Sequence, residues 1–236
     1  LSTEAEIIEE TAAKRPALND THIRSDYTLA NFIVGAHNKL AYACAMEILE
    51  NSSNRLHPCF VQSGSGLGKT HLLQAIWHEL QQRNDGRNAV YVSAEMFTNQ
   101  FVYALRSHRL DAFRSRYRNA DILLIDDVHF LRHKSGLQEE LLHTFEAVDA
   151  RGRQIVLASD AHPKALQDVK TSLVNRFASG MIVQIGRPDF ATRVSILKAR
   201  SRQLRRAIPD DVVRYLCRGF EGSIRELIGA LTTLMA

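Results

Sequence analysis

The stretch that most constrains this chain is residues 63–70, Ser-Gly-Ser-Gly-Leu-Gly-Lys-Thr, which lies between an apolar run and an amphipathic segment. Glycines let backbone N–H groups curl around an anion without side chains in the way. A lysine at this spacing reaches the β- and γ-phosphates of a nucleotide, and a threonine hydroxyl binds the bridging Mg²⁺. The sequence therefore predicts a P-loop whose nucleotide contacts are Ser65, Gly66, Leu67, Gly68, Lys69 and Thr70.

The flanks of this loop support the prediction. Residues 59–62 have the composition of a buried strand, and residues 71–80 place apolar side chains at helical spacing, which gives the strand, loop and helix order that the motif requires. Ser63 stands where the usual pattern has its first glycine, and a small side chain there should be tolerated. The alternative is a glycine-rich turn that binds nothing.

The rest of the chain alternates strands and helices. Apolar runs at residues 89–93, 122–126, 154–159 and 181–185 predict four more strands, and helical spacing marks residues 38–49, 94–107, 109–117 and 137–148. In the helix over 94–107 we expect Phe97, Phe101, Val102 and Leu105 to face inward. From Pro188 onward the pattern is helical, at about residues 189–204, 209–219 and 223–235. We predict an α/β three-layer fold with a five-stranded parallel sheet, followed by a small helical lid.

This pattern divides the chain into three parts, which are a tail or linker (residues 1–26), a nucleotide-binding core (27–187) and the lid (188–236). No apolar run approaches the length of a transmembrane helix, and residues 1–26 lack the order of a signal peptide, so we expect a cytoplasmic protein. The cysteines and histidines form no metal-ligand pattern. Arginines gather at residues 106–118 and 200–206, which suits an anionic partner, although a solvated helix face also explains them.

Acidic residues follow two of the predicted strands. Asp126 and Asp127 end the run Ile122-Leu123-Leu124-Ile125, and Asp160 ends the next strand. Ligands of parallel α/β sheets bind at this edge, so Asp126 is the natural second Mg²⁺ ligand beside Thr70, and Asp127 could orient or deprotonate an attacking water. Polar termination of a strand is the other explanation. The sequence leaves open whether Arg176 and Arg225 are surface residues or phosphate contacts.

From Tyr27 onward the chain resembles the AAA+ domain of the DnaA family of bacterial replication initiators. The likeness is carried by residues 31–35, 38–41, 66–75, 91–95, 117–121, 123–127, 138–140, 143–145, 223–227 and 229–231. It implies an ATP switch: ATP with Mg²⁺ drives assembly into a helical oligomer on duplex and single-stranded origin DNA and promotes strand opening. Slow intrinsic hydrolysis, the only enzymatic activity implied, leaves an inactive ADP form. A replicative helicase, regulators and acidic membrane lipids are further partners that the likeness allows.

The resemblance also assigns roles by position. Lys69, Thr70 and Asp126 bind Mg-ATP, and the nucleotide contacts extend to Val34, Asn38 and His71. Asp160 is the first sensor of the γ-phosphate, Arg225 is the second, and Arg176 is a finger that reaches the nucleotide of a neighbouring subunit. Leu110–Arg118 falls in the paired-helix insertion that marks initiators, and Val102 and Lys134 match positions that contact single-stranded DNA.

Departures from the family pattern keep a second function open. Gly136 and Ser172 stand where arginines are common, which weakens the expectations for strand binding and for contact between subunits respectively. The C-terminal helix-turn-helix domain of the family is missing, and the chain lacks an initiator methionine, so we expect a fragment or a paralogue without that domain. The alternative is a regulatory AAA+ adaptor, such as an initiator inactivator or a helicase loader. Asp127, where many hydrolytic AAA+ proteins carry Glu, argues against a fast ATP-driven motor.

Overall fold

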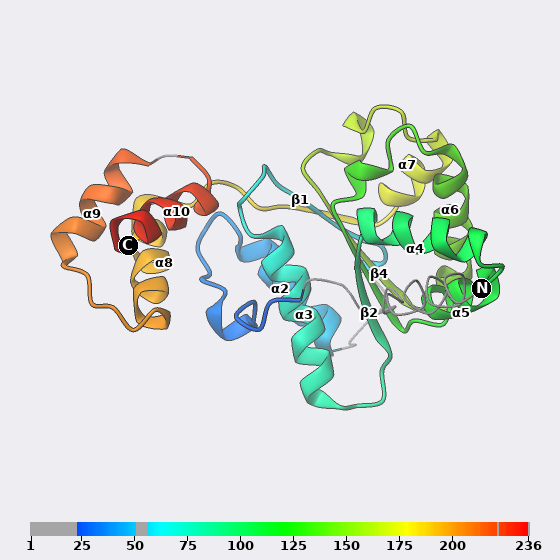
Figure 1. Cartoon of the computed structure of the whole chain (residues 1–236), viewed down its shortest axis with the longest axis horizontal. Coiled ribbons are helices and arrows are strands. Elements are labelled where there is room, and N and C mark those ends of the chain that lie inside the picture. Colours follow the sequence, from blue (N-terminus) through cyan, green and yellow to red (C-terminus); the bar gives the residue numbers. More distant parts are fainter. Residues whose placement is uncertain (1–22, 51–55, 221, 236) are drawn as a thin grey trace, which may run out of the picture.

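The computed structural model describes residues 23–50, 56–220 and 222–235. In this part of the chain a five-stranded parallel sheet lies between two layers of helices, and three helices form a lid beside it (Figure 1). The strands are β1 (Cys59–Gln62), β2 (Ala89–Ser93), β3 (Ile122–Asp126), β4 (Gln154–Ser159) and β5 (Met181–Gln184). The core helices are α2 (Lys39–Glu50), α3 (Lys69–Arg83), α4 (Ala94–Arg106), α5 (Leu110–Arg118), α6 (Ser135–Asp149) and α7 (Thr171–Phe177), with short 3-10 turns η1 (Leu29–Asn31), η3 (Val128–Leu131) and η4 (Pro163–Ala165).

The layers follow from the alternation of side chains along each strand. Successive residues of a strand point to opposite faces of the sheet. On β3, Leu123 and Ile125 are buried against the layer of α4, α5, α6 and α7, whereas Ile122 and Leu124 are buried against α2 and α3. Both faces are covered, which explains why the central strands are continuous apolar runs.

The strand order places the polar ends of the strands at one edge. The order is β2-β3-β4-β1-β5, so β1, which leads into the P-loop, lies between β4 and β5. In the parallel register Gln62 pairs with Ser159, and Ser93 pairs with Asp126. The carboxyl ends of β1, β3 and β4 therefore meet at the edge where open α/β sheets bind their ligands.

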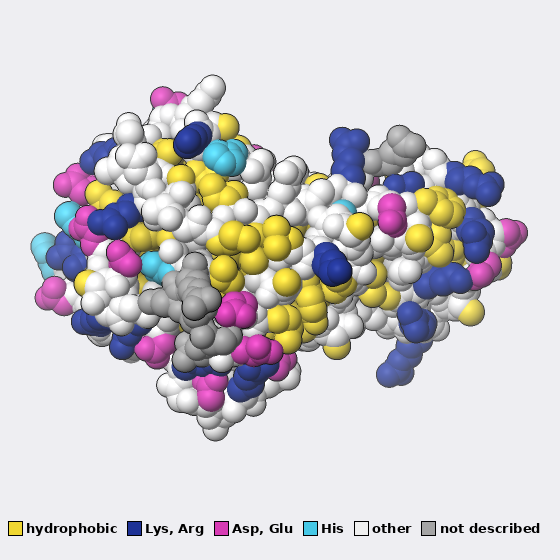
Figure 2. Space-filling view, turned by 180° about the vertical axis from the view of Figure 1, so that it is seen from behind, with side chains coloured by type: hydrophobic (Ala, Val, Ile, Leu, Met, Phe, Trp, Pro, Cys, Tyr) yellow, Lys and Arg dark blue, Asp and Glu magenta, His cyan; other side chains and the backbone are white. Residues whose placement is uncertain are grey.

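The lid consists of α8 (Phe190–Gln203), α9 (Asp210–Gly219) and α10 (Ile224–Met235) around its own small core. Figure 1 shows it on the side of α2 and α3, away from α4 to α7. Its surface is rich in cationic side chains (Figure 2), among them the exposed Arg202, Arg205, Arg206, Arg214 and Arg218.

The expected α/β fold with its lid is confirmed, and each predicted helix or strand in the described part has a counterpart within a few residues. The inward face predicted for the helix over 94–107 is partly wrong, because Val102 and Leu105 are 38% and 46% exposed while Ala104 is buried. Helix α7 was not expected.

Of the segment assigned to a tail or linker, residues 1–22 lie outside the described residues, whereas Arg24 already donates its backbone N–H to Gln74 of α3. Among the described residues, none of the helices has the length and apolar character needed to span a membrane.

Candidate nucleotide-binding site

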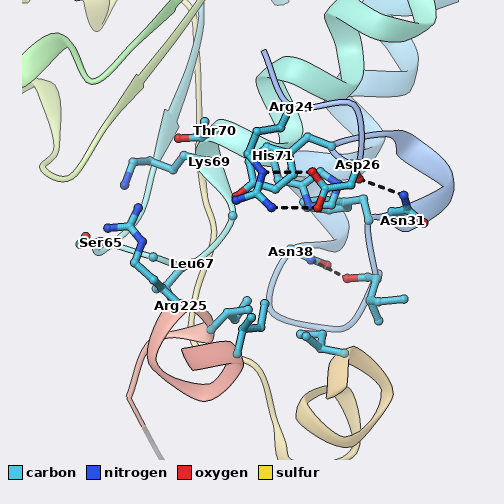
Figure 3. A pocket seen from close by; sticks show the side chains of 18 of the residues that line it. Arg24, Asp26, Asn31, Asn38, Ser65, Leu67, Lys69, Thr70, His71 and Arg225 are labelled. Carbon is cyan, nitrogen blue, oxygen red and sulfur yellow. Dashed lines mark hydrogen bonds and ion pairs between the residues drawn. The ribbon is translucent and has the colours of Figure 1, made fainter. Parts of the chain in front are cut away.

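One pocket of about 480 Å³ opens at this edge of the sheet (Figure 3). It lies between the P-loop, the segment that precedes α2, the loop after β3, the end of β4, and helices α8 and α10 of the lid. The structure thus brings together segments from both ends of the chain. All seven residues of the predicted contact run 65–71 line it.

The P-loop backbone has the conformation that its glycines allow. Gly66 and Gly68 have φ values of +72° and +108°, which side-chain-bearing residues rarely adopt. A Cβ on Gly66 would lie 2.9 Å from Cβ of Ser223 and 3.0 Å from Cβ of Arg225, so the loop is pressed against the first turn of α10. Helix α3 begins at Lys69 and directs its N-terminus, where positive dipole charge accumulates, at the pocket.

Lys69 is held by the loop itself. Its Nζ donates to the carbonyl oxygens of Ser63 and Gly64 at 2.9 and 3.1 Å. Burial lowers the pKa of Lys69, although the carboxylates of Asp127, Asp126 and Asp160 favour its charged form. Ser63 is buried and its hydroxyl donates to the Gly64 carbonyl at 2.9 Å, so the departure from glycine is accommodated within the loop.

A second cation faces the P-loop from the lid. Arg225 extends from the first turn of α10 toward Ser65 and the P-loop (Figure 3), and its backbone N–H donates to the Gly66 carbonyl at 3.3 Å. Its positive charge is one of the influences that lower the pKa of Lys69. No ion pair joins the Arg225 guanidinium to an acid of the described residues. Two cations that share one cavity favour a ligand with several negative charges.

Asp126 lies beneath the pocket and is 2% exposed. Its carboxylate accepts hydrogen bonds from the Thr70 side chain, from the Tyr91 hydroxyl at 3.2 Å and from the Asp127 backbone N–H at 2.9 Å. Burial, together with the nearby charge of Asp127, raises the pKa of Asp126 to about 6. A divalent cation would relieve this cost, because its charge compensates the buried carboxylate.

Asp127 and Asp160 line the pocket itself, as predicted from their places after β3 and β4. Asp127 adopts a left-handed conformation, with a φ of +54°, which Asp tolerates better than most residues. His129 follows on η3 and was not foreseen. Its Nδ1 lies 3.4 Å from Oδ1 of Asp160 and 4.0 Å from Oδ1 of Asp127, so the ring lies between the two strand ends.

The other end of the pocket is shaped by the segment before α2. Asn38 accepts a hydrogen bond from the Gly35 backbone N–H at 2.8 Å and donates to the Ile33 carbonyl at 3.0 Å, which holds this loop closed. Ile33 and Asn38 line the pocket, but the side chain of Val34 is 44% exposed and does not. Successive side chains of an extended segment point in opposite directions, so Ile33 faces the pocket here, and the nucleotide contact expected of Val34 stays a prediction.

His71 is fixed in the same wall. Its ring stacks on Tyr27, with 4.6 Å between centroids and 7° between planes, and its Nε2 lies 2.9 Å from the Thr28 carbonyl oxygen. Burial lowers the pKa of His71. The neutral ring therefore donates from Nε2 and presents a flat, partly apolar surface next to the pocket.

These features fit a nucleotide with Mg²⁺. The P-loop amides, Lys69 and Arg225 would hold phosphates, and Thr70 and Asp126 would hold the cation, directly or through water. When bound, the cation neutralises phosphate charge. The fit rests on the backbone cradle at Gly66 and Gly68, on the two converging cations, and on the hydrogen bond between Thr70 and Asp126.

Three other predicted site residues lie outside this pocket. Arg176 is on α7, where it contacts Asp149 and Glu146 of α6. Val102 is on the outer surface of α4, and Lys134 directly precedes α6. Their positions neither complete the pocket nor exclude contacts with other molecules.

An ion-pair bridge across the pocket was missed from the sequence. Asp26 pairs with Arg24 at 2.8 Å and with Arg200 of α8 at 3.1 Å, and all three residues line the pocket. Arg200 belonged to one of the arginine bunches, but nothing in the sequence indicated its partner. Residues 26 and 200 meet only because the lid folds back beside the start of the core.

Comparison with known proteins gives a consistent result. The family model of the bacterial DnaA ATPase domain matches residues 23–184. The chromosomal replication initiator DnaA of Herpetosiphon aurantiacus is 44% identical over 210 residues, which cover 89% of this chain and 44% of that protein. DnaA of Thermus thermophilus is 42% identical over 224 residues, or 95% of this chain and 50% of that protein. The chain thus spans about half the length of the curated relatives it matches.

Solved structures agree. Domain III of the Thermotoga maritima replication initiation protein DnaA superposes with a TM-score of 0.86 at 38% identity, covering 91% of this chain and 90% of that one. A replication initiator DnaA bound to AMPPCP and single-stranded DNA gives a TM-score of 0.82 at 38% identity, covering 91% of this chain and 66% of that one.

The parallel sheet, the P-loop after β1, the acids after β3 and β4, and the arginine-bearing lid define a P-loop protein of the AAA+ class. Within that class, the chain belongs to the bacterial DnaA ATPase-domain family.

Proposed function

We propose that this chain is the ATP-dependent switch of a bacterial replication initiator, which assembles on origin DNA when ATP is bound and promotes strand opening. The observation that carries the proposal is the convergence of Lys69 and Arg225 on one cavity between core and lid, in a chain of the DnaA ATPase-domain family. A homologue bound to AMPPCP and single-stranded DNA gives further support.

In this proposal the terminal phosphate of ATP links core and lid. Lys69 contacts it from the P-loop, and Arg225 contacts it from α10. Asp160 senses it from the end of β4, and Asp127 orients the attacking water. Because ADP lacks that phosphate, the lid contact through Arg225 is weaker in the ADP form, and the two nucleotides stabilise different arrangements.

Assembly follows from a contact between subunits. Arg176 lies outside the pocket of its own chain and is partly exposed, which suits a residue that reaches the nucleotide of a neighbour. A coupling free energy of about 1–3 kcal/mol per interface is typical when binding at one site is linked to binding at another. Repeated along a filament, such coupling would make assembly strongly cooperative. Binding of single-stranded DNA through Val102, Lys134 and surface arginines would add a contribution to the binding free energy that depends on the salt concentration.

The test is sedimentation velocity with Mg-ATP or Mg-ADP, with and without single-stranded DNA. We expect ATP, but not ADP, to shift the chain to larger species, and strand addition to extend them. Lys69→Ala should abolish nucleotide binding, whereas Arg176→Ala should retain nucleotide affinity and lose self-association. Wild-type protein that stays monomeric with ATP and DNA, at concentrations far above its nucleotide affinity, would contradict the initiator proposal.

The adaptor alternative remains distinguishable by the same variants. An adaptor that acts on another AAA+ protein would keep its self-association unchanged in Arg176→Ala and would alter hydrolysis by its partner. The family match supports the initiator instead. The chain is also similar in structure to the DnaC helicase loader, but at 12% sequence identity this similarity concerns the fold alone.

A further inference from the structure

The guanidinium of Arg176 is held on one side by two carboxylates of α6. Its Nη1 lies 3.4 Å from Oδ2 of Asp149, and its Nη2 lies 3.7 Å from Oε1 of Glu146. All three side chains are between 41% and 46% exposed. Exposed ion pairs of this kind add little to stability. The contacts also leave N–H groups of the guanidinium available to a second partner, since arginine has five donors.

Behind Asp149 stands a buried histidine, His57, which is 7% exposed. Its Nε2 lies 3.3 Å from Oδ1 of Asp149, and its Nδ1 accepts a hydrogen bond from the Ile155 backbone N–H at 3.2 Å. A neutral imidazole that accepts at Nδ1 carries its proton on Nε2. That proton therefore lies on the nitrogen that is close to Asp149, but among the described residues Nε2 has no partner with full hydrogen-bond geometry, so the contact with Asp149 is close in distance and poorly aligned.

The environment keeps this ring in its neutral form. Burial lowers the pKa of His57, and the nearby Asp149 carboxylate only partly opposes the effect. Phe145 of α6 packs against the ring, with 5.7 Å between centroids. His57 is thus anchored to the backbone of β4, with its Nε2 placed 3.3 Å from one oxygen of Asp149, while the other oxygen of Asp149 faces Arg176.

We propose that His57 and Asp149 are positioning residues for Arg176. They fix the guanidinium at the surface before a neighbouring subunit arrives, in a pose that the nucleotide of that subunit completes. This inference rests on the proposed role of Arg176 in self-association. Ordering an arginine side chain costs conformational entropy, so a pre-set guanidinium binds its second partner more tightly than a free one.

The distances from Arg176 to Asp149 and Glu146 indicate that these carboxylates orient the guanidinium and do not block it. A charge-assisted hydrogen bond between guanidinium and carboxylate is typically about 2.7–2.9 Å. The contacts of Arg176 are longer than that, and Asp149 divides its charge between Arg176 and His57. Asp149 therefore orients Arg176 without closing off its capacity to bind phosphate.

The experiment compares Asp149→Asn and His57→Phe with wild type by sedimentation velocity in Mg-ATP and Mg-ADP. Both variants should raise the concentration needed for half-maximal ATP-dependent self-association at least fivefold, with unchanged affinity for a fluorescent ATP analogue. Glu139→Gln is the matched control, because it removes a comparably exposed α6 contact, to Lys170 at 3.0 Å, that does not involve Arg176. Its self-association should match wild type.

The same series separates the possible failures. If Arg176→Ala assembles like wild type, the proposed role of Arg176 is wrong. If Arg176→Ala fails to assemble while Asp149→Asn and His57→Phe behave like wild type, only the positioning inference is overturned. Tighter assembly of Asp149→Asn would also overturn it, because Asp149 would then restrain Arg176. Should His57→Phe fold poorly, Asp149→Asn alone decides, and nitrogen chemical shifts of His57 in wild type report whether Nε2 carries the proton.

Discussion

At the scale of single residues, Asp126 shows how a site can oppose stability. Its carboxylate is buried beneath the pocket, and burial raises its pKa to about 6. In the unfolded chain an Asp side chain has a pKa of about 4. The folded state therefore holds this proton more tightly, so the penalty for the buried charge is absent below about pH 4, grows between pH 4 and 6, and is complete above about 6. A bound cation removes the reason for this penalty.

We therefore expect Asp126→Asn to stabilise the metal-free protein at pH 7.5 by about 1–3 kcal/mol, since the amide keeps the shape and carries no charge. At pH 4.5 the difference from wild type should shrink. Urea unfolding at both pH values in the presence of EDTA measures it. Asp160→Asn, whose side chain is 43% exposed, serves as the control. A variant that loses equal stability at both pH values would show that the charge of Asp126 is already compensated in the folded protein.

The placement of site residues was predictable where their signals are local in sequence. Lys69, Thr70 and Asp126 could be placed at one edge of the sheet because a P-loop and a strand ending in acids are contiguous signals. His129, Asp26 and Arg200 could not, because their partners are brought to them by the fold. That Ile33 lines the pocket was not expected either, because the sequence alone does not show which side chains of an extended segment face the pocket.

At the scale of secondary-structure elements, Glu140 joins α5 to α6. Its side chain is 5% exposed and accepts hydrogen bonds from Arg114 at 2.9 Å and from Arg118 at 2.7 Å. Burial alone would raise the pKa of Glu140, but the hydrogen bonds from these two arginines hold it below its usual value. The contribution to stability is thus present above about pH 4.3, the unfolded value, and is lost as the pH falls through the lower folded value.

Glu140→Gln should lower the free energy of unfolding at pH 7 by about 1–3 kcal/mol, because both guanidinium groups lose a charged acceptor. Nucleotide affinity should stay unchanged, since Glu140 does not line the pocket. Urea unfolding and nucleotide titration provide the two measurements. Glu139→Gln, on the neighbouring exposed position of α6, should cost less than about 1 kcal/mol. Equal losses in both variants would mean that the burial of Glu140 adds nothing.

Most elements were predictable because each has a strong local pattern. The central strands are apolar runs that end in polar residues, and the lid helices carry apolar side chains at helical spacing. Helix α7 was not predicted because it spans only seven residues, of which Leu173 and Phe177 are buried, so its helical spacing is too short to recognise. The strand order could not be predicted either, because β1 lies between β4 and β5, to which it is joined by contacts between residues far apart in the sequence.

At the scale of the whole molecule, the site depends on how the lid meets the core. The two are joined at the pocket by the hydrogen bond from the Arg225 backbone N–H to Gly66 and by the ion pair between Asp26 and Arg200. The lid has its own small apolar core around Leu197, so we expect it to move as a unit if these contacts are lost.

Gly66→Ala tests this arrangement. The residue has a φ of +72°, and a Cβ there would lie 2.9 Å from Ser223 and 3.0 Å from Arg225, so the change strains the P-loop and pushes α10 away. We expect at least about a tenfold loss of nucleotide affinity and a larger radius of gyration in solution scattering, since the left-handed conformation alone costs about 1–2 kcal/mol. Gly229→Ala is the matched control: it lies on α10 with open space around its Cβ position, and alanine there favours the helix. If Gly66→Ala binds ATP like this control and keeps the same radius, the lid does not rest on the P-loop in the way that the phosphate-linked switch requires.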